Sequence, residues 1–97
     1  MNNPMAQTNA LMRAAMDGDI HIVKRIISDK NENVNQIDGD ERTALHWAAA
    51  LGQFEAVELL LSIPQIQVNS VDDAGWTPLM SAVSAGHLKI VDMLLQQ

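Results

Sequence analysis

The sequence predicts an all-α solenoid of three helix–turn–helix units that are joined by extended, β-hairpin-like fingers. The first reason is repetition, because a pattern that begins with Thr and ends with Gly recurs about 34 residues later, a spacing typical of stacked repeats. The second is composition. Of all residues 47% are hydrophobic but only 3% are aromatic, so the apolar residues are mostly Ala, Leu, Ile, Val and Met. This composition favours helices over strands.

The repeat can be followed through nearly the whole chain. The segment Thr43–Gly52 aligns with Thr77–Gly86, and the same shift carries Val57–Leu61 onto Val91–Leu95. In the other direction the shift finds Asn9–Gly18. We therefore expect a single domain over residues 1–97, with repeat one at about 6–38, repeat two at about 39–72 and repeat three at about 73–97.

Each unit has the residues that begin and end a first helix. A side chain that can cap the helix N-terminus precedes it, and a Gly suited to positive φ follows it. The caps are Asn9, Thr43 and Thr77, and the glycines are Gly18, Gly52 and Gly86. Pro78 suits the first helical position. A second helix follows with apolar residues at helical spacing, and the polar segments 31–42 and 68–76 are expected to form the fingers.

Stability is expected to come from stacking, because no single unit can bury its apolar face. The alanine pairs at 14–15 and 48–49 allow neighbouring helices to approach closely. We expect Trp47, inside the first helix of unit two, to be in the core or partly buried between units. A stack of three repeats should be marginal, with a free energy of unfolding near or below ~5 kcal/mol.

Charge and cysteine content restrict the classes of partner and the cellular location that we expect. The formal net charge is −6, which argues against nucleic acid and against an anionic membrane surface. A basic or mixed-charge protein partner fits better, although acidic charge can also serve only solubility. The chain has no Cys, no signal-peptide pattern at its start and no apolar run of membrane-spanning length. We expect a cytoplasmic and nuclear location.

Catalysis and metal binding find no support in the residue patterns. The His residues, His21, His46 and His87, lack the Cys or carboxylate partners usual for zinc; we expect the last two to bond backbone groups and His21 to face solvent. Asp72 and Asp73 are adjacent in a finger, where turn formation explains them better than acid–base chemistry. We therefore predict no enzyme activity, no metal site and no cofactor.

The repeated motif resembles that of a known family. Thr43-Ala44-Leu45-His46 and Thr77-Pro78-Leu79-Met80 are similar to the T-P-L-H signature of ankyrin repeats. The resemblance extends to the closing Gly, to the Val…Leu-Leu helix and to the Val-Asn…Asp before each finger. It implies a protein-binding solenoid. Met80 and Met12 stand where the motif has His, and we interpret both as core variants.

A narrower resemblance is to the gankyrin-type assembly chaperones of the proteasome. It rests on the runs Asp38–Ala48 and Asp72–Leu79, which are similar to the starts of the second and third repeats of that family. The resemblance implies a non-catalytic chaperone whose concave face binds the C-terminal domain of an ATPase subunit of the proteasome regulatory particle, largely by charge pairing. It also implies that Arg42 belongs to the contact surface. The alternative is a generic ankyrin adaptor or scaffold in signalling or transcription control.

The repeat register maps the expected binding groove. Finger residues and the ends of the first helices should face it, and together they mix acidic, basic, aromatic and small side chains typical of a protein interface. The candidates are Met16, Asp17, Asp40, Arg42, Ala50, Leu51, Asp73, Ala74, Trp76 and Ser84. Trp76 is either a binding residue or packs against the neighbouring finger, and both alternatives stay open.

The two ends of the predicted stack differ. Arg25 stands where the later units have Leu59 and Met93, which suits a first repeat whose outer face meets water. The last helix carries Met93-Leu94-Leu95, an apolar stripe that is expected to lie uncovered. We therefore expect a C-terminally truncated array, with a monomer as the solution state and self-association through this end as the alternative.

Overall fold

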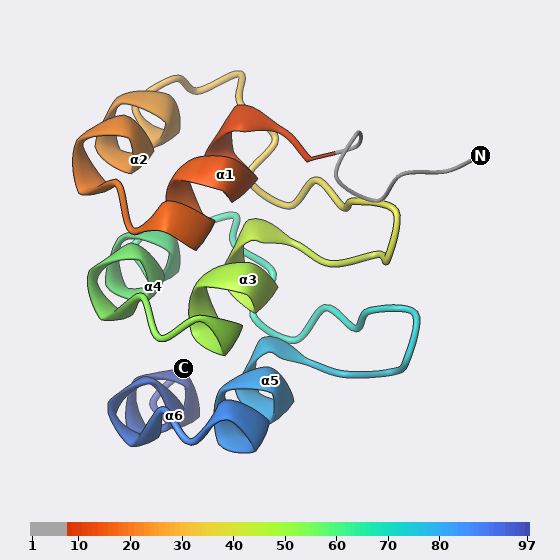
Figure 1. The fold of residues 1–97 in the computed structure, drawn as a ribbon. Helices are drawn as coiled ribbons and strands as arrows, with labels where there is room; N and C mark the ends of the chain where they lie inside the picture. The colour runs from red at the N-terminus through yellow and green to blue at the C-terminus, as the bar shows by residue number, and fades with distance from the viewer. Residues whose placement is uncertain (1–7) are drawn as a thin grey trace.

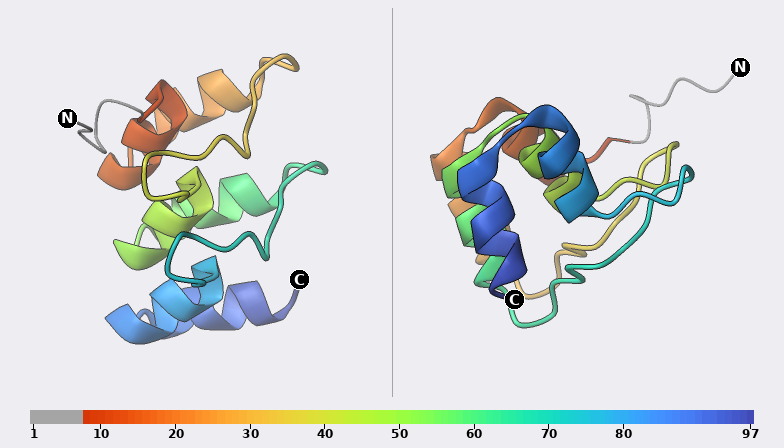
Figure 2. Two further views of the ribbon diagram at one scale, coloured as in Figure 1. Left: turned by 90° about the vertical axis from the view of Figure 1, so that its right-hand side faces the viewer. Right: turned by 90° about the horizontal axis from the view of Figure 1, so that it is seen from below.

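The computed structural model describes residues 8–97 as three helical hairpins stacked in two layers (Figure 1). The helices of this part of the chain are α1 (Ala10–Asp17), α2 (Ile20–Ile27), α3 (Ala44–Ala50), α4 (Phe54–Leu61), α5 (Pro78–Ala85) and α6 (Leu88–Leu95). The first helices of the units form one layer and the second helices the other, while two fingers extend to one side (Figure 2). The all-α solenoid is confirmed. The predicted start of repeat one, at residue 6, lies outside the described residues.

The N-terminus of each first helix is capped as predicted. The Asn9 side chain accepts a hydrogen bond from the Met12 N–H at 2.8 Å. Thr43 accepts one from the His46 N–H at 3.3 Å, and Thr77 accepts one from the Met80 N–H at 3.2 Å. These bonds satisfy backbone donors that the helix itself leaves unpaired. The prediction that Pro78 is the first residue of its helix is also confirmed.

The glycines after the first helices adopt left-handed backbone conformations, as predicted. Gly18, Gly52 and Gly86 have φ of 69°, 75° and 78°. In unit two the helix ends one residue earlier than the sequence indicated, because Leu51 takes the cap position before Gly52. Gln53 and His87 follow these turns and reach back to the preceding unit, where their Nε2 atoms lie 2.9 Å from the Met16 carbonyl and 3.2 Å from the Ala50 carbonyl.

Two of these glycines form a matched pair for mutation. Gly52→Ala should lower the free energy of unfolding by more than Gly86→Ala does. Both substitutions force positive φ on a residue with a Cβ, at a cost of about 1–2 kcal/mol. Only at Gly52 would the new Cβ also approach the His87 ring, at 2.7 Å, whereas at Gly86 it would meet nothing within 4 Å. Urea unfolding of both variants checks this, and equal losses would contradict the proposed contact.

The core is formed by the apolar faces of neighbouring units. Helix α3 lies at its centre and packs against α1 and α5 in its own layer and against α4. Leu11 and Leu45 are fully buried at equivalent positions, and the alanine pairs of α1 and α3 are buried between the helices. The small side chains let the helices pack closely, as the sequence predicted. Trp47 is half-buried, and Arg25 on the outer unit is exposed, both in agreement with expectation.

The outer face of unit three differs from two expectations. Met12 is a core residue at 1% exposure, but Met80 is 44% exposed, so its interpretation as a core variant is wrong. The reason is its place in the stack, since no described unit packs on the outer side of α5. The predicted uncovered stripe at the end of α6 is also only partly right. Leu95 is exposed, whereas Leu94 is buried and Met93 half-buried.

No helix within residues 8–97 is long and apolar enough to cross a membrane.

Candidate protein-binding face

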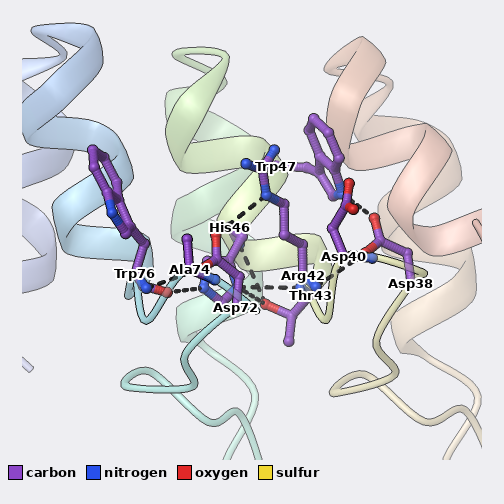
Figure 3. Close-up of polar contacts among 9 residues, drawn as sticks. All are labelled: Asp38, Asp40, Arg42, Thr43, His46, Trp47, Asp72, Ala74 and Trp76. Atoms are coloured by element: carbon purple, nitrogen blue, oxygen red, sulfur yellow. Dashed lines mark hydrogen bonds and ion pairs between the residues drawn. The ribbon is translucent and has the colours of Figure 1, made fainter. Parts of the chain in front are cut away.

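A buried aspartate organises each finger turn (Figure 3). Oδ1 of Asp38 accepts hydrogen bonds from the N–H groups of Asp40 at 2.9 Å and Arg42 at 3.0 Å. One repeat later, Oδ1 of Asp72 accepts from the N–H groups of Ala74 and Trp76, both at 2.9 Å. Each aspartate N–H also donates at 2.9 Å to the carbonyl four residues on. No β-strand forms in residues 8–97, so the fingers are hairpin-like only through such turn bonds, which include the Glu41 N–H to the Asp38 carbonyl and the Gly75 N–H to the Asp72 carbonyl, both at 3.0 Å.

The two turns share one backbone position with positive φ. Glu41 has φ of 61°, and Gly75, one repeat later, has φ of 81°. Glu41 is the one residue other than Gly with positive φ in the described chain, a conformation that costs a residue with a Cβ about 1–2 kcal/mol. The Asp38 carboxylate holds the turn in spite of this cost. As a result Arg42 and Trp76 occupy equivalent positions, each at the end of its finger and next to the start of a first helix.

The second oxygen of each aspartate has a different partner. Oδ2 of Asp38 accepts a hydrogen bond from Trp47 Nε1 at 2.8 Å. Oδ2 of Asp72 pairs with Arg42 Nε at 3.3 Å, and Cζ of Arg42 lies 4.8 Å from the centroid of the Trp47 ring. The Arg42 side chain is 37% exposed and is thus held between a carboxylate and an indole. Because the ion pair uses Nε, the two terminal NH₂ groups stay available to a ligand.

The pKa of Asp72 reflects these contacts. Burial of the carboxylate acts to raise its pKa. The N–H groups of Trp76 and Ala74 and the Arg42 guanidinium outweigh burial, so the pKa of Asp72 lies below its ordinary value of 3.8. The turn aspartate is therefore ionised at neutral pH, which is the state that the finger requires.

His46 connects the middle helix to the next finger. Its Nδ1 accepts the Thr43 N–H at 3.1 Å, which leaves the proton on Nε2, and Nε2 lies 2.8 Å from the Trp76 carbonyl (Figure 3). Burial lowers the pKa of His46 below its ordinary value of 6.5, so the ring is neutral at pH 7. The prediction that His46 and His87 bond backbone groups is confirmed, and His21 is exposed as expected.

A shallow depression of about 200 Å³ lies between the second finger and the middle of the stack. It is lined by Arg42, His46, Ala50, Trp76, Ser81, Ser84 and Ala85. Four predicted groove residues meet here, namely Arg42, Ala50, Trp76 and Ser84. Sequence reasoning missed Ser81, although it precedes Ser84 by three residues and therefore shares its helix face. We call this depression with its two flanking fingers the finger groove.

The other predicted groove residues lie outside the depression. In the fingers, the Asp40 carbonyl accepts the Asp73 N–H at 3.0 Å, which joins the two fingers, and Ala74 is exposed. In the first helices, Met16 is half-buried and Asp17 exposed. Leu51 is 49% exposed and caps α3 at the helix–helix turn. Their part in binding stays a prediction.

The finger groove presents binding chemistry. The Arg42 guanidinium and the hydroxyl groups of Ser81 and Ser84 can donate hydrogen bonds to a carboxylate of a partner. The Trp76 indole can pack against an apolar side chain of the partner beside that carboxylate. Within residues 8–97, no three His, Asp or Glu side chains gather closely enough to hold a metal ion. The lining holds Ser81, Ser84 and His46, but both ring nitrogens of His46 are engaged with Thr43 and the Trp76 carbonyl, and in the described chain no hydrogen bond joins this ring to either serine. The open shape of the depression suits a protein surface more than a small substrate.

Stacked helix pairs with such a face define a helical-repeat binding protein. A family model described as "Ankyrin repeats (3 copies)" matches residues 8–97. The chain therefore belongs to the ankyrin-repeat family, whose repeats are protein–protein interaction modules and typically non-catalytic. A search of curated proteins gives no match.

Proposed function

We propose that the chain is a non-catalytic, gankyrin-like chaperone that holds the C-terminal domain of a proteasomal ATPase in its finger groove. The observation that carries this proposal is the presentation of Arg42. Asp72 and Trp47 fix the side chain through Nε and the ring face, while its terminal NH₂ groups stay available. A guanidinium held in this way loses little side-chain entropy when it pairs with a carboxylate.

Charge and sequence support the same proposal. The net charge of −6 favours a protein partner with basic regions over nucleic acid or an anionic membrane. The run Asp38–Ala48, which resembles the gankyrin-type chaperones, contains the first finger turn and Arg42 itself. On this proposal the chain acts in the cytoplasm and nucleus. A generic ankyrin adaptor with another protein partner is the second candidate, because the same groove chemistry would serve it.

Titration calorimetry with the isolated C-terminal domain of a proteasomal ATPase tests the proposal. Arg42→Ala should weaken binding by about 1–2 kcal/mol, because a charged pair at the centre of the interface is lost. Arg25→Ala is the matched control, since it removes the same charge from an exposed position on the outer unit and should leave affinity unchanged. Circular dichroism must show that both variants stay folded.

The outcome separates the two candidates. Binding that weakens only in Arg42→Ala supports the chaperone. If the folded wild-type chain does not bind this domain, the chaperone proposal is wrong and the adaptor remains. Binding that is equally strong in Arg42→Ala would show that the finger groove is not the contact surface.

A further inference from the structure

A second surface runs along the starts of the second helices, away from the fingers. The first residue of each is apolar, namely Ile20 in α2, Phe54 in α4 and Leu88 in α6. The helix–helix turns that precede them lie one below another in Figure 1. Ile20 is half-buried, but Phe54 is 39% and Leu88 73% exposed. We call these three residues the turn stripe. The solvent-facing start of a helix has no structural need for a large apolar side chain, so the stripe requires an explanation.

Two shallow depressions lie along the turn stripe, one at each junction between units. The upper one, of about 200 Å³, is lined by Gly18, Ile20, Gln53, Phe54, Glu55 and Ala56. The lower one, of about 220 Å³, is lined by Gly52, Phe54, His87, Leu88, Lys89 and Ile90. The linings consist largely of equivalent residues one repeat apart, and Phe54 belongs to both. The stack therefore presents the same recess twice, bordered each time by the apolar side chains that begin the second helices.

Inter-unit hydrogen bonds hold both recesses in shape. Gln53 Nε2 donates to the Met16 carbonyl at 2.9 Å in the upper recess, and His87 Nε2 lies 3.2 Å from the Ala50 carbonyl in the lower one. The adjacent glycines leave no spare room, because a Cβ at Gly18 would run into Gln53 and one at Gly52 into His87. Recesses that exist before binding need little reorganisation when a ligand enters them.

The charges beside the two recesses are opposite. Glu55 lies at the upper recess, and Lys89 occupies the equivalent position at the lower one. Asp17 and Asp19, at the turn of unit one, are exposed and add negative charge at the upper end. A ligand that crosses both recesses therefore meets an acidic side chain beside one and a basic side chain beside the other.

The spacing of the recesses selects the secondary structure of the ligand. Packed helices lie about 8–10 Å apart, so equivalent points on neighbouring units are separated by about that distance. Residues i and i+7 of an α-helix lie on nearly the same face, about 10.5 Å apart. In a strand, same-face residues lie about 6.7 or 13 Å apart, and neither distance matches. A helix laid along the stack fits both recesses at once.

We propose that the turn stripe binds one amphipathic α-helix of a partner protein. Apolar residues i and i+7 of that helix occupy the two recesses, and residue i+3 or i+4 covers Phe54. A Lys or Arg of the helix lies next to Glu55, and an Asp or Glu lies next to Lys89. The surface is separate from the finger groove, so the chain can hold two segments at once, and this proposal does not depend on the proposed chaperone function.

The probe is a synthetic Ala-rich peptide helix of about 18 residues, long enough to be partly helical in water. It carries Leu at i, i+4 and i+7, Lys beside the first Leu and Glu beside the last. We expect saturable binding to the 97-residue chain by fluorescence anisotropy. Phe54→Ser should weaken binding at least about tenfold, because Phe54 contributes to both recesses. Arg42→Ala, in the finger groove, should leave it unchanged.

A charge exchange tests the pairing without changing the net charge. Glu55→Lys alone removes the acidic side chain that lines the upper recess and Lys89→Glu alone makes both recesses acidic, and each should weaken binding about threefold. The double variant Glu55→Lys/Lys89→Glu should bind more tightly than either single variant, because the peptide can bind in the opposite direction. No binding below about 1 mM, an unaffected Phe54→Ser variant or a double variant no better than the singles would each overturn the proposal.

Discussion

Leu45→Ala should leave much of the chain unfolded at 37 °C. Leu45 is fully buried in α3, the helix that packs against both neighbouring units, and removing its side chain leaves a cavity at the centre of the stack. Leu-to-Ala changes at such sites cost about 3–5 kcal/mol. Because a stack of three repeats is expected to have a total of only about 5 kcal/mol, little stability should remain. Urea unfolding followed by circular dichroism measures the loss.

Leu51→Ala is the matched control for this experiment. It removes the same atoms from a residue of the same unit that is 49% exposed, so the expected loss is below about 1 kcal/mol. Leu79→Ala should lie between the two, because the equivalent Leu of unit three is only half-buried. Similar losses at Leu45 and Leu51 would contradict a core centred on α3.

The fold could be predicted because its determinants are local and repeated. The cap at Thr43 depends on a residue three positions away, and Gly52 needs positive φ whatever surrounds it. Each such feature occurs in every unit, so an ambiguous segment could be read from its equivalents. The boundaries of the first helices followed to within a residue. Local rules could not predict that Met80 is exposed, because its burial depends on which units stack against it rather than on its own helix.

The finger groove was only partly predictable, for the same reason. The repeat register placed Arg42 and Trp76 at equivalent points of two fingers, and the structure brings both to one depression. The register could not show that Arg42 is held by Asp72, because the two residues are 30 positions apart and belong to different fingers. Nor could it show that Asp38, at the position equivalent to Asp72, pairs instead with Trp47. Equivalent residues share a backbone geometry but not their partners.

The turn stripe shows a further limit of the repeat register. Its residues begin second helices, for which the sequence indicated only apolar residues at helical spacing. Exposure separates the equivalent positions: Ile20 is half-buried, whereas Phe54 and Leu88 are exposed. An apolar pattern therefore locates a helix face, but only the structure shows whether the stack covers that face.

His46→Met should destabilise the chain by about 1–3 kcal/mol at pH 7.5, through lost hydrogen bonds rather than lost volume. Met12 is buried at the equivalent position of unit one, so the fold accepts the shape of Met there. The substitution leaves the Thr43 N–H without a partner, whereas the Trp76 carbonyl keeps the hydrogen bond from the Asp72 N–H. A buried polar group that loses its partner costs about 1–3 kcal/mol. Met12→Leu, an apolar exchange at the equivalent buried site of unit one, is the control and should cost less than about 1.5 kcal/mol.

The same substitution should remove one part of the pH dependence of stability. Burial lowers the pKa of His46 in the folded chain, whereas in the unfolded chain it titrates near 6.5. The unfolded state therefore binds more protons below pH 6.5, so the stability due to neutral His46 is present above that pH and is lost as pH falls towards the folded pKa. Asp72, whose pKa is lowered, contributes stability above 3.8 that is lost only at more acidic pH.

Urea unfolding of both chains at several pH values separates these two groups. Between about pH 7 and 5 the wild-type chain should lose stability while His46→Met changes less, so the difference between them should narrow. Below about pH 4 both should lose stability, because Asp72 is present in each. This result requires a neutral imidazole. In the folded chain Nδ1 accepts the Thr43 N–H, and a proton on Nδ1 would point at that N–H and break the bond. Curves that stay parallel from pH 7 to 5 would mean that His46 keeps its ordinary pKa and that its contacts do not depend on the neutral ring.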